Sequence, residues 1–234
     1  MKTPQIEEKN FGIDFPEGFS LEKARRIQAT LSSKIITKDM LPQSLSYVAG
    51  IDAAYSNNWA FVSVAIMEYL GLKTVEVESI VTRTYFPYVP TLLMFREAHP
   101  MIHALSKLKI KPDICLIDGH GLAHPYRCGL ASCVGVIANI PTVGVAKKLL
   151  CGSIGAPNEQ NYATIIDNGN IVGASIYTRP KSNPVYVSIG NMVCLDTAIN
   201  IVKHCIKQYR LPEPIREAHK MANELRRQTL EETI

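Results

Sequence analysis

A chain of 234 residues, 47% hydrophobic and 20% charged, is long enough for one sizeable hydrophobic core and short for two. This composition excludes a disordered or fibrous protein. The formal net charge of +4 in 25.9 kDa is a mild excess, which excludes a densely basic architectural nucleic-acid binder and permits a polyanionic substrate. We therefore expect a single domain spanning residues 1–234.

The sequence predicts a cytoplasmic protein without membrane contact. No stretch reaches the roughly 18 consecutive apolar residues of a membrane helix, and the N-terminus lacks the apolar run of a signal peptide. The six cysteines form no Cys-x-x-Cys pair, and several stand inside apolar runs, as Cys115 does. Buried free thiols in a reducing cytoplasm fit this pattern better than a disulfide framework or a zinc site.

The first part of the chain predicts a helix followed by an antiparallel meander. Apolar residues recur at helical spacing over 21–31. Three strand-like runs follow in close succession, and a Ser-Asn-Asn turn separates the first two. These runs cover residues 47–55, 60–67 and 75–85.

After residue 91 the pattern changes to alternating helices and strands. Parallel strands need crossover connections, so this alternation predicts parallel strands with helices packed on the sheet. We therefore expect an α/β fold with a mixed sheet, in which an antiparallel meander is followed by parallel strands and helices flank the sheet. The expected helices cover 92–108, 129–139, 195–209 and 213–227, and the expected strands cover 113–118, 142–146, 170–177 and 185–187.

Two aspartates occupy positions that otherwise suit buried strands. Asp52 interrupts the apolar run 48–54, and Asp118 ends the apolar run 114–117 just before a Gly-His-Gly turn. A carboxylate in such a setting is costly unless positive charge satisfies it, and strand ends of this kind open onto the functional crevice of α/β sheets. Each aspartate also has a structural interpretation, because aspartates at strand ends commonly cap helices or accept hydrogen bonds from turns.

A third acid, Glu97, lies in the early turns of the helix expected over 92–108. If that turn faces the sheet, three carboxylates from separate elements converge, and such a set suits a hard ion such as magnesium or manganese. Two such ions about 3.5–4 Å apart can stabilise the attacking and leaving oxygens in phosphodiester hydrolysis. Acids are common in first helical turns, so only the joint appearance of the three predicts hydrolysis of a phosphate ester.

Four short strings, taken in order, resemble the signature of the endonuclease V family. They are VAGIDAAY at 48–55, PYVPTLLMFRE at 87–97, DGHGLAHP at 118–125 and PTVGVAKK at 141–148. The resemblance runs from about Ala24 to Pro214, nearly the whole chain. It implies a ribonuclease H-like fold, Mg²⁺ as cofactor with Mn²⁺ as a substitute, and a DNA repair reaction that cuts the second phosphodiester bond 3′ to deoxyinosine.

The resemblance also assigns the catalytic residues. Asp52, Glu97 and Asp118 match the family's metal-binding carboxylates, and Lys147 matches its active-site lysine. A compact ammonium near the scissile phosphate would offset the charge that develops in the transition state. Without the motif, Lys147 would be interpreted as a surface lysine at the start of a helix.

The remaining matches fall on the family's substrate-binding positions. An aromatic ring between two prolines resembles the wedge that enters the base stack, and small residues nearby resemble the pocket that receives the extruded base. Taken alone, the Pro-Tyr-Val-Pro string is a rigid turn with an exposed tyrosine. The expected substrate-binding residues are Pro87, Tyr88, Val89, Pro90, Leu93, Gly119, Gly121, Leu122, His124, Gly129 and Asn191.

Two positions depart from the family's commonest pattern. Thr91 stands where glycine is usual, which predicts a tighter pocket or an added hydroxyl contact. Asn191 stands where a histidine that assists the metal site is expected. Because an amide cannot titrate, we expect only an outer-shell or substrate contact from Asn191.

Three functions remain open on the sequence. The first is a monomeric endonuclease whose partner is DNA containing deoxyinosine. The second keeps the same centre and acts on inosine-containing RNA, since a 2′-hydroxyl contact depends on side-chain placement. The third is a non-catalytic module that binds damaged nucleic acid. The complete set of three acids and Lys147 argues against the third, because a pure binder has no need of concentrated negative charge beside phosphates.

Overall fold

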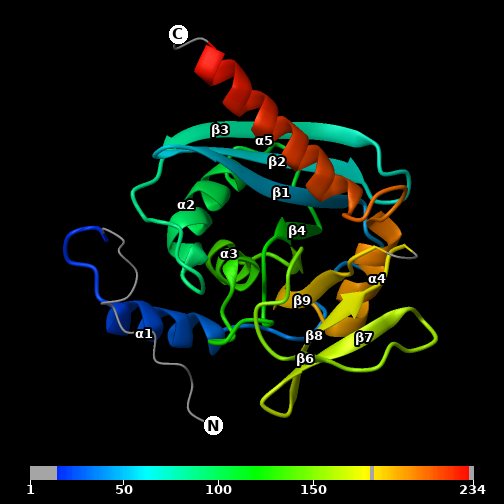
Figure 1. Ribbon diagram of the computed structural model, residues 1–234. Helices are drawn as coiled ribbons and strands as arrows, with labels where there is room; N and C mark the ends of the chain where they lie inside the picture. The colour runs from blue at the N-terminus through cyan, green and yellow to red at the C-terminus, as the bar shows by residue number, and fades with distance from the viewer. Residues whose placement is uncertain (1–14, 180–181, 232–234) are drawn as a thin grey trace.

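The computed structural model describes residues 15–179 and 182–231, and its strands in these ranges form one nine-stranded sheet. The strand order is β3-β2-β1-β4-β5-β9-β8-β7-β6 (Figure 1). The strands are β1 (Tyr47–Ser56), β2 (Trp59–Glu68), β3 (Thr74–Arg83), β4 (Ile114–Asp118), β5 (Thr142–Ala146), β6 (Ser153–Ile154), β7 (Tyr162–Asp167), β8 (Asn170–Ile176) and β9 (Val185–Asn191). The helices are α1 (Leu21–Ser32), α2 (Leu93–Leu105), α3 (Leu130–Ala138), α4 (Leu195–Cys205) and α5 (Glu213–Glu231).

The centre of the sheet combines antiparallel and parallel pairing. Strands β1, β2 and β3 form an antiparallel meander, β4 lies parallel to β1, and β5 lies parallel to β4. Strand β9 then returns antiparallel to β5 and continues into the β8-β7-β6 meander. The predicted fold class, a ribonuclease H-like mixed sheet with flanking helices, is confirmed.

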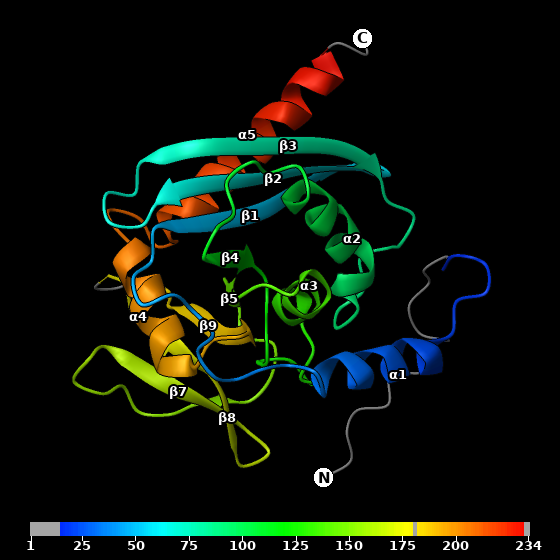
Figure 2. The same ribbon diagram turned by 180° about the vertical axis from the view of Figure 1, so that it is seen from behind.

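Helices cover both faces of the sheet. Figure 2 shows α2 and α3 on one side of β1–β3, with α5 on the other. Side chains alternate across a strand: Ala49 and Ile51 of β1 join the core under α2 and α3, whereas Val48 joins the core that includes α4 and Ile215 of α5. Successive residues of β1 therefore face two different cores. Even-numbered residues of β1 point toward α5, and odd-numbered residues point toward α2 and α3. None of the helices in the described ranges is long and apolar enough to cross a membrane.

Several elements differ from the sequence-based expectation. Strands β6 and β7 have no counterpart among the expected strands, helix α2 ends at Leu105 instead of 108, and α5 continues to Glu231 instead of ending at 227. Strand β9 continues to Asn191 instead of ending at 187. Strand β9 is buried on both faces, so it lacks the polar alternation that marks a half-exposed strand. Helix α4 ends at Cys205 instead of 209, because Ile206 adopts an extended conformation.

Candidate active site

Asp52 and Asp118 are neighbours on the two central parallel strands. The register pairs Ile51 with Ile117, so the next residue on each strand brings the two aspartates side by side. Asp52 has the same parity as Gly50 and points to the face that α5 covers. Two carboxylates therefore lie together where β4 ends, beneath α5.

Helix α5 contributes a residue that the sequence analysis missed, His219. Its Nδ1 lies 2.6 Å from Oδ2 of Asp52, while Oδ1 of Asp52 accepts a hydrogen bond from the backbone N–H of Ala53 at 2.8 Å. The side chain of Asn223, one turn later, lies 3.2 Å from Nε2 of the histidine. No local sequence pattern marks His219, since a lone histidine on an amphipathic helix is ordinary and only the docking of α5 brings it to Asp52.

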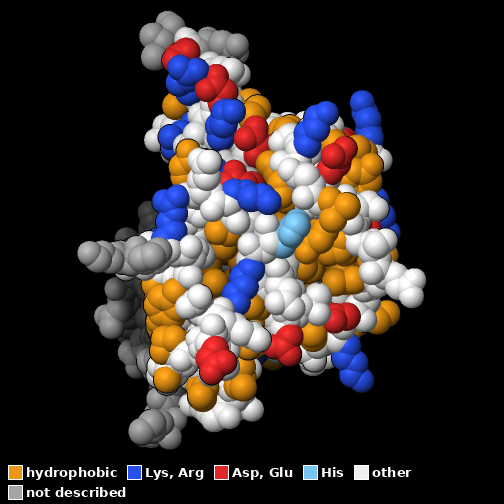
Figure 3. Space-filling model, turned by 90° about the vertical axis from the view of Figure 1, so that its right-hand side faces the viewer, with side chains coloured by type: hydrophobic (Ala, Val, Ile, Leu, Met, Phe, Trp, Pro, Cys, Tyr) orange, Lys and Arg blue, Asp and Glu red, His pale blue; other side chains and the backbone are white. Residues whose placement is uncertain are grey.

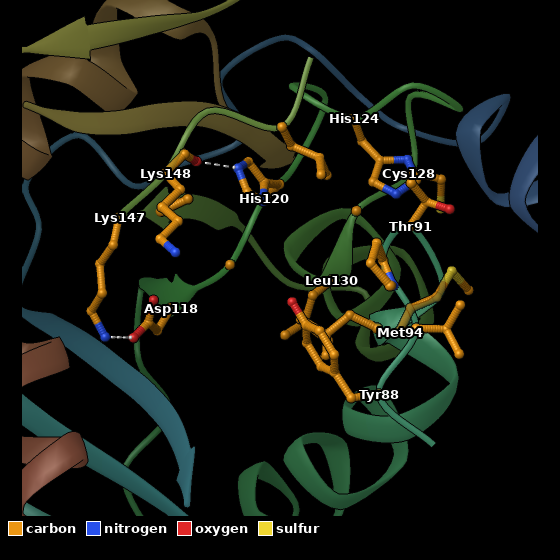
Figure 4. Close-up of a pocket in the computed structure, with 17 residues that line it drawn as sticks. Tyr88, Thr91, Met94, Asp118, His120, His124, Cys128, Leu130, Lys147 and Lys148 are labelled. Carbon is orange, nitrogen blue, oxygen red and sulfur yellow. Dashed lines mark hydrogen bonds and ion pairs between the residues drawn. The ribbon is translucent and has the colours of Figure 1, made fainter. Parts of the chain in front are cut away.

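Lys147 reaches the same cluster from the end of β5, the parallel neighbour of β4. Its Nζ lies 2.5 Å from Oδ2 of Asp118, and Figure 4 shows the two side chains meeting. Burial acts to lower the pKa of Lys147, but the charge of Asp118 and this hydrogen bond outweigh it, so the pKa of the lysine is raised. The ammonium therefore stays protonated beside the carboxylates.

Glu97 lies on α2, the helix that packs on the face of the sheet opposite to α5. Burial, followed by the negative charges of Asp52 and Asp118, raises the pKa of Glu97 to about 8, although the neighbouring Tyr55 hydroxyl partly lowers it. The ring of Tyr55 lies under the Arg96 guanidinium, 4.2 Å from its centroid. The structure thus brings all three predicted acids within electrostatic range of one another.

The donor chemistry of this cluster suits a divalent cation. Burial and the charge of Asp118 raise the pKa of Asp52, and mutual repulsion of three carboxylates is relieved when a small ion shares their oxygens. In the described ranges, no three His, Cys, Asp or Glu side chains are gathered tightly enough to hold an ion as they stand. Lys147 and His219 are instead the partners of the two aspartates, so ion binding would require these contacts to rearrange.

A pocket of about 370 Å³ opens beside Asp118 and Lys147 (Figure 4). The loop before α2 forms one wall, and the turn after β4 together with the start of α3 forms the other. Thr91 and Met94 also line it, and Tyr88 projects across it. Of the expected substrate-binding residues, those that line the pocket are Tyr88, Val89, Pro90, Leu93, Gly119, His124 and Gly129.

Other expected substrate-binding residues lie outside this pocket wall. Gly121 packs against β9, where an added Cβ would meet the carbonyl oxygen of Ile189 at 2.0 Å, and its N–H donates to Ser188 Oγ at 2.9 Å. Leu122 packs against the core beneath α4. Pro87 precedes Tyr88 and does not line the pocket.

Asn191 lies at the opposite end of the strands from the acidic cluster. It pairs with Thr142, which in turn pairs with Cys115, and Cys115 precedes Asp118 by three residues, or about 10 Å of strand. The Asn191 amide donates to the backbone oxygen of Gly135 at 3.0 Å and accepts from the N–H of Ile36 at 3.0 Å. The structure therefore gives Asn191 a packing role, and the histidine beside the carboxylates comes from α5.

His124 in the pocket wall predicts an acid sensitivity of the fold. Burial, with the nearby His120 and the Arg25 charge, lowers its pKa from 6.5 to about 3. Between these values the unfolded state binds more protons than the folded state, so stability falls as pH falls through this window. We expect His124 alone to cost about 2 kcal/mol of unfolding free energy at pH 5 relative to pH 7.

Urea unfolding at pH 7 and pH 5 measures this effect. The His124→Gln variant, which cannot titrate, should lose less stability between the two pH values than the wild-type protein. An identical loss in both proteins would show that His124 is not the sensitive group.

The strand order and the acid cluster define a class of protein. It is a ribonuclease H-like α/β protein with three carboxylates, a lysine and a histidine near the end of β4. Comparison with known proteins narrows the class to a family. The family model for endonuclease V matches residues 29–220. The chain therefore belongs to the endonuclease V family.

Individual relatives cover nearly the whole chain. Endonuclease V of Thermofilum pendens is 42% identical over 218 residues, 93% of this chain and 94% of the relative. The crystal structure of endonuclease V from Streptomyces avermitilis matches with a TM-score of 0.84 and 32% identity, covering 92% of this chain and 98% of that one. A Ciona intestinalis endonuclease V, solved with a DNA 24mer containing an inosine followed by a ribo-adenosine, matches with a TM-score of 0.80 and 30% identity, covering 89% and 98%.

Proposed function

We propose that this protein is a divalent-metal-dependent endonuclease that repairs DNA containing deoxyinosine, the deaminated form of deoxyadenosine, by nicking the second phosphodiester bond on its 3′ side. The observation that carries the proposal is the shared wall between the pocket and the acid cluster. Asp118 and Lys147 belong to both. A base held in the pocket would therefore keep its strand's backbone beside the carboxylates. The Ciona relative, solved with inosine-containing DNA, supports this substrate class.

Asp52, Asp118 and Glu97 would hold Mg²⁺, or Mn²⁺ as a substitute, with His219 beside Asp52. When bound, the ion would supply Lewis-acid stabilisation of the charge on the phosphate. The ammonium of Lys147 would lie against the scissile phosphate and offset developing negative charge. The carboxylate of Asp118 holds this ammonium at 2.5 Å, and the release of this contact on ion binding would free Lys147 to reach the phosphate.

The loop before α2 would act as the strand-separating wedge. Tyr88 is 66% exposed, whereas the next residue, Val89, is buried. Pro87 and Pro90 restrict the backbone on both sides, so an inserted ring would lose little conformational freedom. The backbone amides around Gly119 would then lie close to the edge of the extruded base, and a poorly paired base would be extruded at the lowest cost.

A second hollow would give the nucleic acid strand a path beyond the carboxylates. It begins at Lys147 and His219, has a volume of about 510 Å³, and is also lined by Arg210, Arg216 and Lys220. These cations would contact phosphates, which predicts affinity that falls with salt. Figure 3 shows acidic and basic side chains intermixed over one face of the molecule. The basic residues on that face therefore do not form one continuous positive surface.

An RNA substrate remains the alternative, favoured by one finding. The nucleic acid bound to the Ciona relative carries a ribo-adenosine directly after its inosine. Matched DNA, RNA and single-ribonucleotide strands distinguish the two substrates. DNA as the natural substrate predicts comparable or faster cutting of the all-DNA strand, and a strong preference for strands with a ribonucleotide would contradict it.

We propose that the chain acts as one domain and as a monomer, because the three acids come from one continuous sheet and a helix packed on it. All six cysteines are free, which supports a reducing cytoplasmic setting.

Strand cleavage by the purified protein tests the proposed function. With Mg²⁺ and an end-labelled duplex containing one deoxyinosine, we expect a single nicked product from the labelled strand. The same duplex with adenine should stay intact, and EDTA should abolish the nick. Cutting of the adenine duplex at the same rate, or cutting unaffected by the chelator, would contradict the proposal.

A further inference from the structure

The loop that carries Tyr88 is held by α1, a helix that lies apart from the sheet (Figure 1). The contact centres on Thr91, at the end of the loop. Gln28 Nε2 donates to the Thr91 carbonyl oxygen at 2.7 Å, and Arg25 Nη2 donates to the Thr91 hydroxyl at 2.9 Å. Arg25 Nη1 also donates to Gln28 Oε1 at 2.7 Å, so the two side chains of α1 act as one unit.

Thr91 adopts a backbone conformation that needs such support. Its φ is +69°, in the left-handed region, which is unfavourable for a β-branched residue. Residues in such conformations cost on the order of 1–3 kcal/mol and persist only when their surroundings hold them. Gln28 is fully buried, so its hydrogen bonds are shielded from water and strong. The Thr91 hydroxyl, for which the sequence predicted either a tighter pocket or an added hydroxyl contact, accepts its hydrogen bond from Arg25 of α1.

An aromatic cluster supports the same loop from its other side. Phe86 packs edge-on against Phe19, with ring centroids 5.3 Å apart, and lies 5.6 Å from Phe95 of α2. Val89 and Leu92 are buried in this cluster. The backbone on both sides of Tyr88 is therefore anchored, while the tyrosine side chain stays exposed.

Arg25 also links the loop to the opposite wall of the pocket. Its guanidinium lies over the Tyr126 ring, 3.8 Å from the centroid, and Tyr126 N–H donates to Nδ1 of His124. Thr91 and His124 lie next to each other in the pocket (Figure 4). One arginine thus contacts Thr91 in one wall directly and is linked through Tyr126 to His124 in the other wall.

We infer that Arg25 and Gln28 are positioning residues for base extrusion, because through Thr91 they fix the Tyr88 loop at a set distance from the far wall of the pocket. The inference rests on the proposed function, in which Tyr88 separates the strands of a duplex. Extrusion from a duplex needs a rigid wedge, whereas a base in a single strand is already largely unstacked. Loss of the contact to α1 should therefore impair reaction on duplex more than on single strand.

Cleavage of one labelled inosine strand, alone and in a duplex, tests this inference. For Arg25→Met and Gln28→Glu we expect about a tenfold loss of rate on the duplex and less than about a twofold loss on the single strand, since hydrogen bonds to charged groups or in buried positions are removed. Arg25→Lys, which keeps one donor, should recover part of the loss. Equal losses on both substrates, or none on the duplex, would overturn the inference.

Arg26→Met is the matched control, because Arg26 is the next residue on α1 and pairs with Glu22 at the surface. It should change neither rate. Because Gln28 is buried, the Gln28→Glu protein must also show wild-type thermal unfolding for its rates to count, and Arg25→Met carries the test if it does not.

A second measurement does not depend on cleavage. A duplex with 2-aminopurine beside the inosine becomes brighter when the neighbouring base leaves the stack, and it can be titrated with protein in EDTA. We expect the fluorescence increase to be lost in Arg25→Met and kept in Arg26→Met. An equal increase in all three proteins, or none with the wild type at saturation, would overturn the inference. Failure of the proposed function alone would appear as fluorescence without strand cleavage.

Discussion

Replacing Asp52 by asparagine should lower the rate of strand cleavage at least about a thousandfold, a loss of about 4 kcal/mol of transition-state stabilisation. Asparagine keeps the shape of the side chain but removes the charge that a divalent ion needs. The position is central, because Asp52 lies beside Asp118, faces His219 at 2.6 Å and interacts electrostatically with Glu97. Single-turnover cleavage of the inosine duplex measures the loss.

Binding separates this effect from a loss of folding. Asp52→Asn should still bind the inosine duplex in a gel-shift assay, because the pocket wall does not include Asp52. Asp196→Asn, an exposed acid in the first turn of α4, should cleave at the wild-type rate. Undiminished nicking by Asp52→Asn would remove this carboxylate from the mechanism.

Gly50→Ala should lower the unfolding free energy by more than about 3 kcal/mol, the upper range for overpacking a core. An added Cβ would lie 2.0 Å from the backbone carbon of Pro214 and 2.1 Å from its oxygen, at the start of α5. Backbone cannot turn aside as a flexible side chain can, so α5 must move away from β1. Because α5 carries His219, we also expect weaker strand cleavage under conditions in which the variant is still folded.

Urea unfolding with a matched glycine measures this prediction. Gly71 lies in the turn after β2, where the nearest atom to an added Cβ is Glu68 Oε2 at 3.9 Å. Gly71→Ala should therefore unfold within about 0.5 kcal/mol of the wild type, as surface substitutions usually do. A Gly50→Ala protein as stable as Gly71→Ala would contradict the close contact between β1 and the start of α5.

Periodicity predicted the central elements well because their burial is one-sided or complete. The meander β1–β3, helix α2 and strands β4 and β5 all lie where the apolar pattern indicated them. The prediction ended β9 at 187, too early, because Ser188, Gly190 and Asn191 interrupt the apolar run although all three are buried. Polar residues in a doubly buried strand carry no strand signal, since tertiary contacts alone satisfy them.

The acids could be predicted from the sequence and their histidine could not. Asp52 and Asp118 interrupt or end apolar runs, so the sequence alone indicates that these carboxylates are buried. His219 meets Asp52 across 167 residues of chain, and its helical face is set by how α5 docks on β1. Asn191 was predicted as a site residue only from the resemblance, and it lies at the opposite end of the strands from the carboxylates.

The role of α1 is a similar case. Arg25 and Gln28 are ordinary residues for an amphipathic helix, and the sequence predicted only the helix itself. Their hydrogen bonds to Thr91 span more than sixty residues of chain. Thr91 stood out in the sequence as a departure from glycine, but the reason it can adopt a positive φ becomes visible only with α1 in place.

Anomalous diffraction from crystals grown with Mn²⁺ is the most direct test of a shared metal centre. We predict an anomalous peak bounded by carboxylate oxygens of Asp52, Asp118 and Glu97, with Lys147 displaced from its direct contact with Asp118. A peak bound elsewhere, with these three side chains left apart, would contradict the proposed chemistry.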